Sequence, residues 1–175
     1  MTLTHACRTV APGWLCQQGD IVLYLAPIVA LALVLRLLAG RHPIFFVFTV
    51  AGTVCHELAH FCAGLVTGAQ PGALTIIPRR QGRHWQLGSV TLHRVRWYNA
   101  APAALAPLAI LALPVAVAWW RTAPGWHYEW RDGVLALLLA PQLLSFWPSA
   151  ADWRIAVRSW PYLLIIAPLA WLAFR

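Results

Sequence analysis

The segment from residue 44 to residue 68 reads IFFVFTVAGTVCHELAHFCAGLVTG, and it determines how the rest of the chain is interpreted. It is a long apolar run, yet it contains His56, Glu57 and His60 in the pattern H-E-x-x-H. Residues four apart share one face of a helix, so both imidazoles can bind one metal ion. Glu57 lies beside them, where it can activate a water at that metal. Because polar groups are costly at membrane depth, we interpret the three residues as a metal site.

The composition predicts an integral membrane protein. Of the 175 residues, 61% are hydrophobic and 10% are charged, whereas soluble domains carry about 25% charged residues. The net charge is +8, and every basic residue is Arg. This charge on an apolar chain indicates contact with anionic lipid headgroups of the bilayer on the cytoplasmic side. Nucleic-acid binding is disfavoured, because the arginines are spread over short loops.

The hydropathy pattern predicts an all-α polytopic fold with about five transmembrane helices. The spans are expected at residues 21–40, 44–68, 100–120, 133–155 and 161–174. A bilayer takes roughly 20 helical residues, so the last span is short. Together they are expected to form one membrane domain over residues 1–175, with a core at 44–158.

The longest polar stretch, residues 69–98, lies between the second and third spans. Residues 73–78 favour a strand, and residues 85–97 partly alternate between apolar and polar side chains. We expect a short amphipathic β-hairpin at the membrane surface. An irregular loop is the alternative.

Two histidines do not complete a catalytic zinc site, which needs a third protein ligand. Asp152 is the best candidate, because it is the carboxylate nearest to a span other than that of the motif. It follows Pro148, which bends the helix. Alternatively, Asp152 pairs with Arg154 or Arg158 at the interface. The other candidate ligands lie in loops, where no helix fixes their geometry: His84, His93, Glu129 and Asp132.

Asn99 begins the third span, just before Ala100-Ala101-Pro102. Its position favours a role as a helix N-cap. The alternative is that its amide hydrogen-bonds a substrate strand or a developing oxyanion.

The distribution of arginine predicts the orientation. The loop at 69–98 holds five arginines, and the connector after the fourth span adds Arg154 and Arg158. Placing both in the cytoplasm also places the N-terminus there. Arginine without lysine is typical of GC-rich bacterial genomes, so we expect the inner (cell) membrane of a bacterium.

These features resemble the site-2 protease family of intramembrane zinc metalloproteases. The resemblance covers roughly residues 45–158. It rests on HELAH in one span, a Pro-containing segment that ends in Asp152 two spans later, and the polar segment between them. It implies that Zn²⁺ is bound by His56, His60 and Asp152, with Glu57 as the catalytic base. The implied activity is regulated intramembrane proteolysis, the hydrolysis of peptide bonds in or near transmembrane segments of membrane-protein substrates. The family usually has Gly after the Asp, whereas this chain has Trp153.

Two other functions fit parts of the pattern. One is a non-catalytic zinc-binding membrane scaffold or inactive protease relative; the intact Glu57 argues against it, because a structural zinc site needs no free base. The other is a metal transporter. Transporters usually show repeated halves and further polar residues along a path, and the sequence has no internal repeat.

Overall fold

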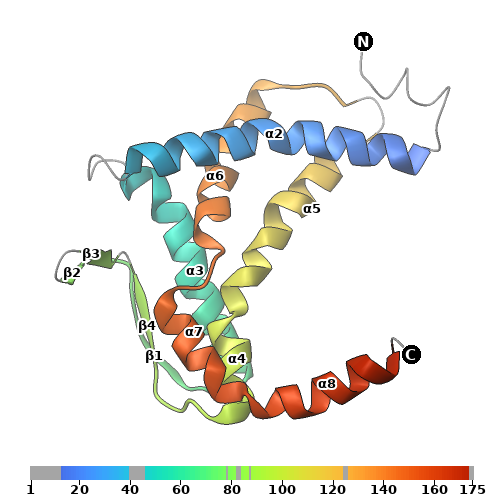
Figure 1. The fold of residues 1–175 in the computed structure, drawn as a ribbon. Helices are drawn as coiled ribbons and strands as arrows, with labels where there is room; N and C mark the ends of the chain where they lie inside the picture. Colours follow the sequence, from blue (N-terminus) through green and yellow to red (C-terminus); the bar gives the residue numbers. More distant parts are fainter. Residues whose placement is uncertain are drawn as a thin grey trace. The chain divides into compact units, whose positions relative to one another are not determined.

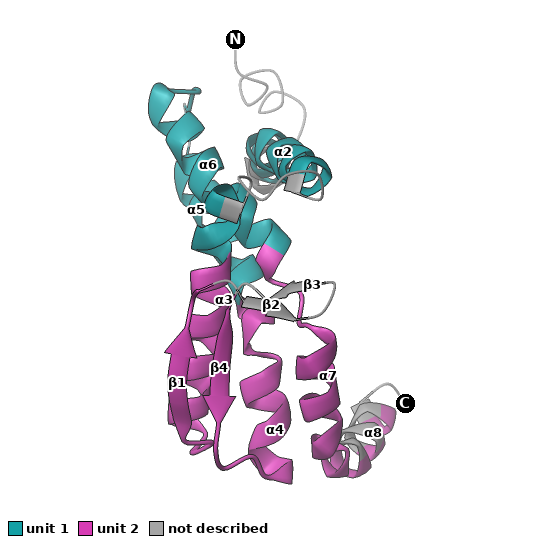
Figure 2. Ribbon diagram, turned by 90° about the vertical axis from the view of Figure 1, so that its left-hand side faces the viewer, with its two compact units in different colours: residues 1–52, 110–144 teal, residues 53–109, 145–175 magenta. Residues whose placement is uncertain are grey.

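The computed structural model describes residues 13–39, 46–77, 79–81, 84–86, 88–123 and 126–173. The chain divides into two compact units, coloured separately in Figure 2. Unit 1 comprises residues 1–52 and 110–144, and unit 2 comprises residues 53–109 and 145–175. That residues 1–175 act as a single membrane domain stays a prediction.

The described chain is mainly helical, with a small β portion (Figure 1). Two long helices come first, α2 (Gly13–Ala39) and α3 (Phe46–Val66). Short strands follow: β1 (Pro71–Thr75), β2 (Arg79–Gln81), β3 (His84–Gln86) and β4 (Ser89–Leu92). The remaining elements are α4 (Trp97–Ala104), the 3₁₀ helix η2 (Ala106–Leu111), α5 (Ala112–Arg121), α6 (Trp130–Ser145), α7 (Ala150–Ala156), η3 (Val157–Ser159) and α8 (Pro161–Ala173).

Two segments of the described chain are long and apolar enough to cross a membrane, Gln18–Leu38 and Trp97–Arg121. Trp130–Ser145 and Ala150–Ser159 make a third if the two helices form one broken span. The prediction of five spans was therefore too high. The 13 residues of α8 extend only about 20 Å, short of a hydrocarbon core of about 30 Å. In α3, the H-E-x-x-H motif places polar residues within the apolar run.

In unit 1, α2 packs against α5 and α6 through one face. Tyr24, Ile28 and Ala32 recur every four residues, and each is at most 4% exposed. They form a buried cluster with residues of α5 and α6, among them Ala118 and Leu139. Spacing by four places these side chains on a single stripe of the helix, so apolar residues elsewhere on α2, such as Val22, Val29 and Leu33, are left exposed.

A buried carboxylate holds the start of α6. Asp132 accepts hydrogen bonds from Arg121 Nε at 2.8 Å and Nη2 at 2.9 Å. It also accepts from the Tyr24 hydroxyl at 3.0 Å and from the backbone N–H of Glu129 at 2.8 Å. The carboxylate thus joins three helices of unit 1, because Tyr24 belongs to α2 and Arg121 to α5.

In unit 2, β1 pairs antiparallel with β4, and β2 pairs antiparallel with β3. The pairing of Leu74 with Val90 confirms a hairpin within residues 69–98.

Two glycines let the strands approach the end of α3. The strands lie close to α3 because residue 64 is glycine. A Cβ there would stand 3.0 Å from Leu92 Cδ2. At the end of α3, Gly68 adopts a φ of 73°, which turns the chain toward β1.

The helices α4 and α7 lie side by side in unit 2 (Figures 1 and 2). Ala100 and Ala103 of α4 are fully buried, and such small side chains let helix backbones approach closely. Ser159 ties α4 to η3, because its hydroxyl accepts from the N–H of Ala101 at 2.8 Å and donates to the carbonyl of Trp97.

Replacing Asp132 with Ala should destabilise unit 1 by about 3 kcal/mol, because it leaves the Arg121 guanidinium and the Tyr24 hydroxyl without their shared partner. Chemical unfolding in mixed detergent micelles, followed by circular dichroism, measures the change. Arg131→Ala is the matched control, since Arg131 is exposed on the same turn of α6. Equal stability of the two variants would contradict the proposed role of Asp132.

Candidate metal centre

The two motif histidines lie one helical turn apart on α3, with their rings facing each other edge to face. The ring centroids are 4.7 Å apart and the planes meet at 78°. The two Nε2 atoms are 3.1 Å apart. His60 is buried, with 6% of its surface exposed. The helical spacing read from the sequence therefore brings the two ring nitrogens to one point.

Asp152 lies in the first turn of α7, and its own helix orients it. Ser149 is the N-cap residue, and its Oγ accepts from the backbone N–H of Asp152 at 3.2 Å. In return, Asp152 Oδ2 accepts from the backbone N–H of Ser149 at 2.7 Å. This reciprocal capping box fixes the carboxylate relative to the helix end.

The Asp152 carboxylate faces both histidines. Its Oδ1 lies 3.3 Å from His60 Nε2, and its Oδ2 lies 3.6 Å from His56 Nε2. One ligand atom from each of the three residues lies within 4.8 Å of the others. His56, His60 and Asp152 are therefore a group that could hold a metal ion, as the sequence predicted.

The separations are close to those around a tetrahedral ion, whose ligand bonds of about 2.0–2.1 Å place neighbouring ligand atoms about 3.3 Å apart. The two Nε2 atoms are 3.1 Å apart, and each lies near a different carboxylate oxygen, His60 at 3.3 Å from Oδ1 and His56 at 3.6 Å from Oδ2. The donors are two imidazole nitrogens and a carboxylate, a set that transition metals bind readily.

Backbone carbonyls fix the protonation of the rings. His60 Nδ1 donates to the carbonyl of Ala103 at 2.8 Å, and His56 Nδ1 donates to the carbonyl of Ser145. Since a carbonyl accepts only, each neutral ring carries its proton on Nδ1, which leaves the Nε2 lone pair available. The two lone pairs then face each other, an arrangement that a cation between them stabilises.

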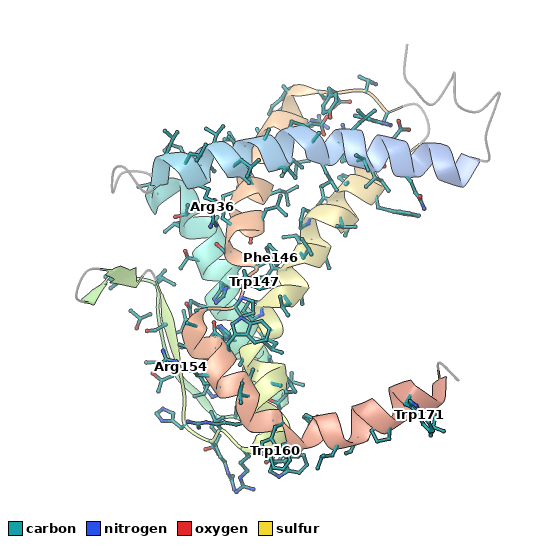
Figure 3. The ribbon with its side chains drawn as sticks, viewed as in Figure 1. Arg36, Phe146, Trp147, Arg154, Trp160 and Trp171 are labelled. Carbon is teal, nitrogen blue, oxygen red and sulfur yellow. The ribbon has the colours of Figure 1, made fainter. Side chains whose placement is uncertain are left out.

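Glu57 lies in the same pocket and is 7% exposed. The pocket encloses about 760 Å³ and includes Trp147, which lies with Phe146 at the break between α6 and α7 (Figure 3). Gly88 covers the carboxylate, since a Cβ there would stand 2.7 Å from Glu57 Cγ and 2.9 Å from Oε1. Only a residue without a side chain can approach so closely.

Several of the alternative ligands and pairings have other partners. Asp132 pairs with Arg121, and Glu129 lies 3.6 Å from His127. Arg154 donates through Nε to the carbonyl of Ala150, within its own helix. The side chain of His84 lies outside the described residues.

Asn99 is not among the residues that line the pocket, and its contact with a substrate or an oxyanion stays a prediction. It is fully buried at the third position of α4 rather than at the N-cap, which is Arg96. Its Oδ1 accepts from the N–H of Arg96 at 2.7 Å, and its Nδ2 donates to the carbonyls of Thr67 and Arg94. The amide therefore serves the turn between β4 and α4.

Several contributors to the site were not anticipated. Ser149 had a sequence signal, because S-x-x-D before a helix is a capping pattern. Gly88 and the carbonyls of Ala103 and Ser145 had none, because their roles depend on which segments the fold brings together.

Comparison with family models, with curated proteins and with solved structures found no match to this chain.

Proposed function

We propose that this chain is an intramembrane zinc metalloprotease of the site-2 protease type, which hydrolyses peptide bonds in or near transmembrane segments of other membrane proteins. The observation that carries the proposal is the presence of Glu57 in one pocket with His56, His60 and Asp152. Three protein ligands leave one tetrahedral position for water or substrate, which is typical of catalytic zinc sites; structural sites have four protein ligands.

Zinc is the metal that the donor set supports best. Two imidazoles and one carboxylate correspond to the ligand class of zinc peptidases, and zinc binds such ligands in tetrahedral geometry. When bound, zinc would lower the pKa of a water and polarise a peptide carbonyl.

The residues of the chain would divide the remaining tasks. Glu57, held against Gly88, is positioned to take a proton from the attacking water and to return it to the leaving amine. The hydrogen bonds to the carbonyls of Ala103 and Ser145 hold the imidazoles with Nε2 directed into the centre. The capping box does the same for Asp152.

The pocket suggests how a membrane segment would be presented. A substrate helix keeps its carbonyls in its own hydrogen bonds, so it must unwind locally before attack. Ser89, Val90 and Leu92 of β4 line the pocket. An unwound segment lying there would run beside the backbone of β4, and strand addition is a common mode of peptide binding.

Substituting Glu57 with Gln should abolish cleavage and leave the metal bound, because the amide cannot accept the proton and is not a ligand. The expected loss in rate is about 10²–10⁴-fold. Asp152→Ala should lose both the metal and cleavage. Metal content is measured by elemental mass spectrometry, and cleavage with a reporter transmembrane segment in proteoliposomes.

Glu129→Gln is the matched control for these variants, since Glu129 is outside the pocket lining. Full cleavage by Glu57→Gln would reject Glu57 as the base. Zinc flux into vesicles without any proteolysis would point to a transporter, and bound zinc with neither activity would point to a scaffold.

Gly88→Ala should reduce kcat by about 10- to 100-fold with metal content unchanged, because the new methyl group displaces the Glu57 side chain by about 1 Å. KM should stay within about twofold, since the substitution is directed at the base. Gly133→Ala is the control, because a Cβ there meets nothing within 4 Å. Unchanged kcat would show that Glu57 tolerates the displacement.

A further inference from the structure

The carbonyl of Ala103, which accepts from His60, lies in the last turn of α4, and the residue four positions further on is a proline. In a continuous α-helix, the carbonyl of Ala103 would accept from the N–H of residue 107. That residue is Pro107, which has no N–H. Pro107 is buried, with less than 2% of its surface exposed. The carbonyl instead accepts from His60 Nδ1 at 2.8 Å.

The carbonyl that holds His56 is released in a similar way. Ser145 is the last residue of α6. Three residues on, Pro148 has no N–H, and four residues on, the N–H of Ser149 is donated to Asp152 Oδ2 at 2.7 Å. The carbonyl of Ser145 accepts from His56 Nδ1. Both metal-facing rings are thus held by carbonyls that lack their usual helical donors.

We infer that Pro107 is a positioning residue for the metal centre: by removing a competing N–H, it reserves the Ala103 carbonyl for His60. The hydrogen bond keeps the proton on Nδ1 and the ring directed at the ion. This inference rests on the metal centre in the proposed function and does not require proteolysis. In this role Pro107 acts through the carbonyl of Ala103.

Pro107→Ala restores the N–H that bonds to the carbonyl of Ala103 in a continuous α-helix, so zinc affinity should fall by about 10- to 100-fold, the range for loss of an outer-shell partner. The probe is Zn²⁺ alone, titrated into the metal-free full-length chain in detergent against a chromophoric chelator. Co²⁺ provides a second readout, since its visible spectrum reports distortion of the ligand geometry. Pro114→Ala is the control, because Pro114 is equally buried in a helix but lies in unit 1.

A third variant separates the missing N–H from the shape of the proline ring. Lactic acid at position 107, introduced by nonsense suppression, has an ester oxygen in place of the N–H and no ring. It should keep zinc affinity within about threefold of the wild type. Wild-type affinity in Pro107→Ala, or at least tenfold weakening in the lactic acid variant, would overturn the inference. If Pro107→Ala does not fold, the lactic acid variant decides alone.

Zinc binding, cleavage and the role of Pro107 can each be rejected separately. Absence of zinc binding by the wild type would remove the metal centre and the proposed protease together. Zinc binding without cleavage would remove only the protease. If zinc affinity does not depend on a backbone N–H at residue 107, only the role of Pro107 is rejected.

Discussion

The Nε2 atoms of His56 and His60 lie 3.1 Å apart, and a carboxylate oxygen of Asp152 lies within 3.6 Å of each. Electron-rich atoms so close together repel one another, and burial removes most of the water that would screen them. A divalent cation at their centre would convert this repulsion into attraction. In unit 2, α3 and α7 supply the three candidate ligands, and α4 supplies the carbonyl of Ala103 that orients His60.

The elements of the fold were predictable where the sequence pattern was local. The apolar runs near residues 21–40, 100–120 and 133–155 correspond to the candidate spans, and the alternating residues of 69–98 form paired strands. The prediction of membrane spans failed where a helix is too short to cross or where polar residues interrupt its apolar run. The last apolar run folds as a helix of 13 residues, too short to cross. The motif helix is apolar at its ends but polar in the part that forms the site.

In the site, too, the residues that follow from a local sequence pattern were predictable. Spacing by four on one helix brings His56 and His60 together, and this follows from helical geometry alone. Asp152 was identified by its proximity to a span and to Pro148. Gly88 and the Ala103 carbonyl could not be found in this way, because the contact between a loop and Glu57, or between a carbonyl and a ring, depends on long-range packing. Asn99 was predicted to be a helix N-cap from its position at a helix start, whereas the structure places it at the third position of α4, where its amide closes a turn.

The capping box at Asp152 links the ion to the integrity of a helix. The same carboxylate that faces His56 and His60 also accepts the first N–H of the turn that begins α7. Fraying of that turn would release the acid from the centre, and withdrawal of the ion would leave the acid free to swing with the helix end. If an ion binds there, metal affinity and local opening of residues 150–156 would be thermodynamically linked. Amide hydrogen exchange in this segment would then report whether the centre is occupied.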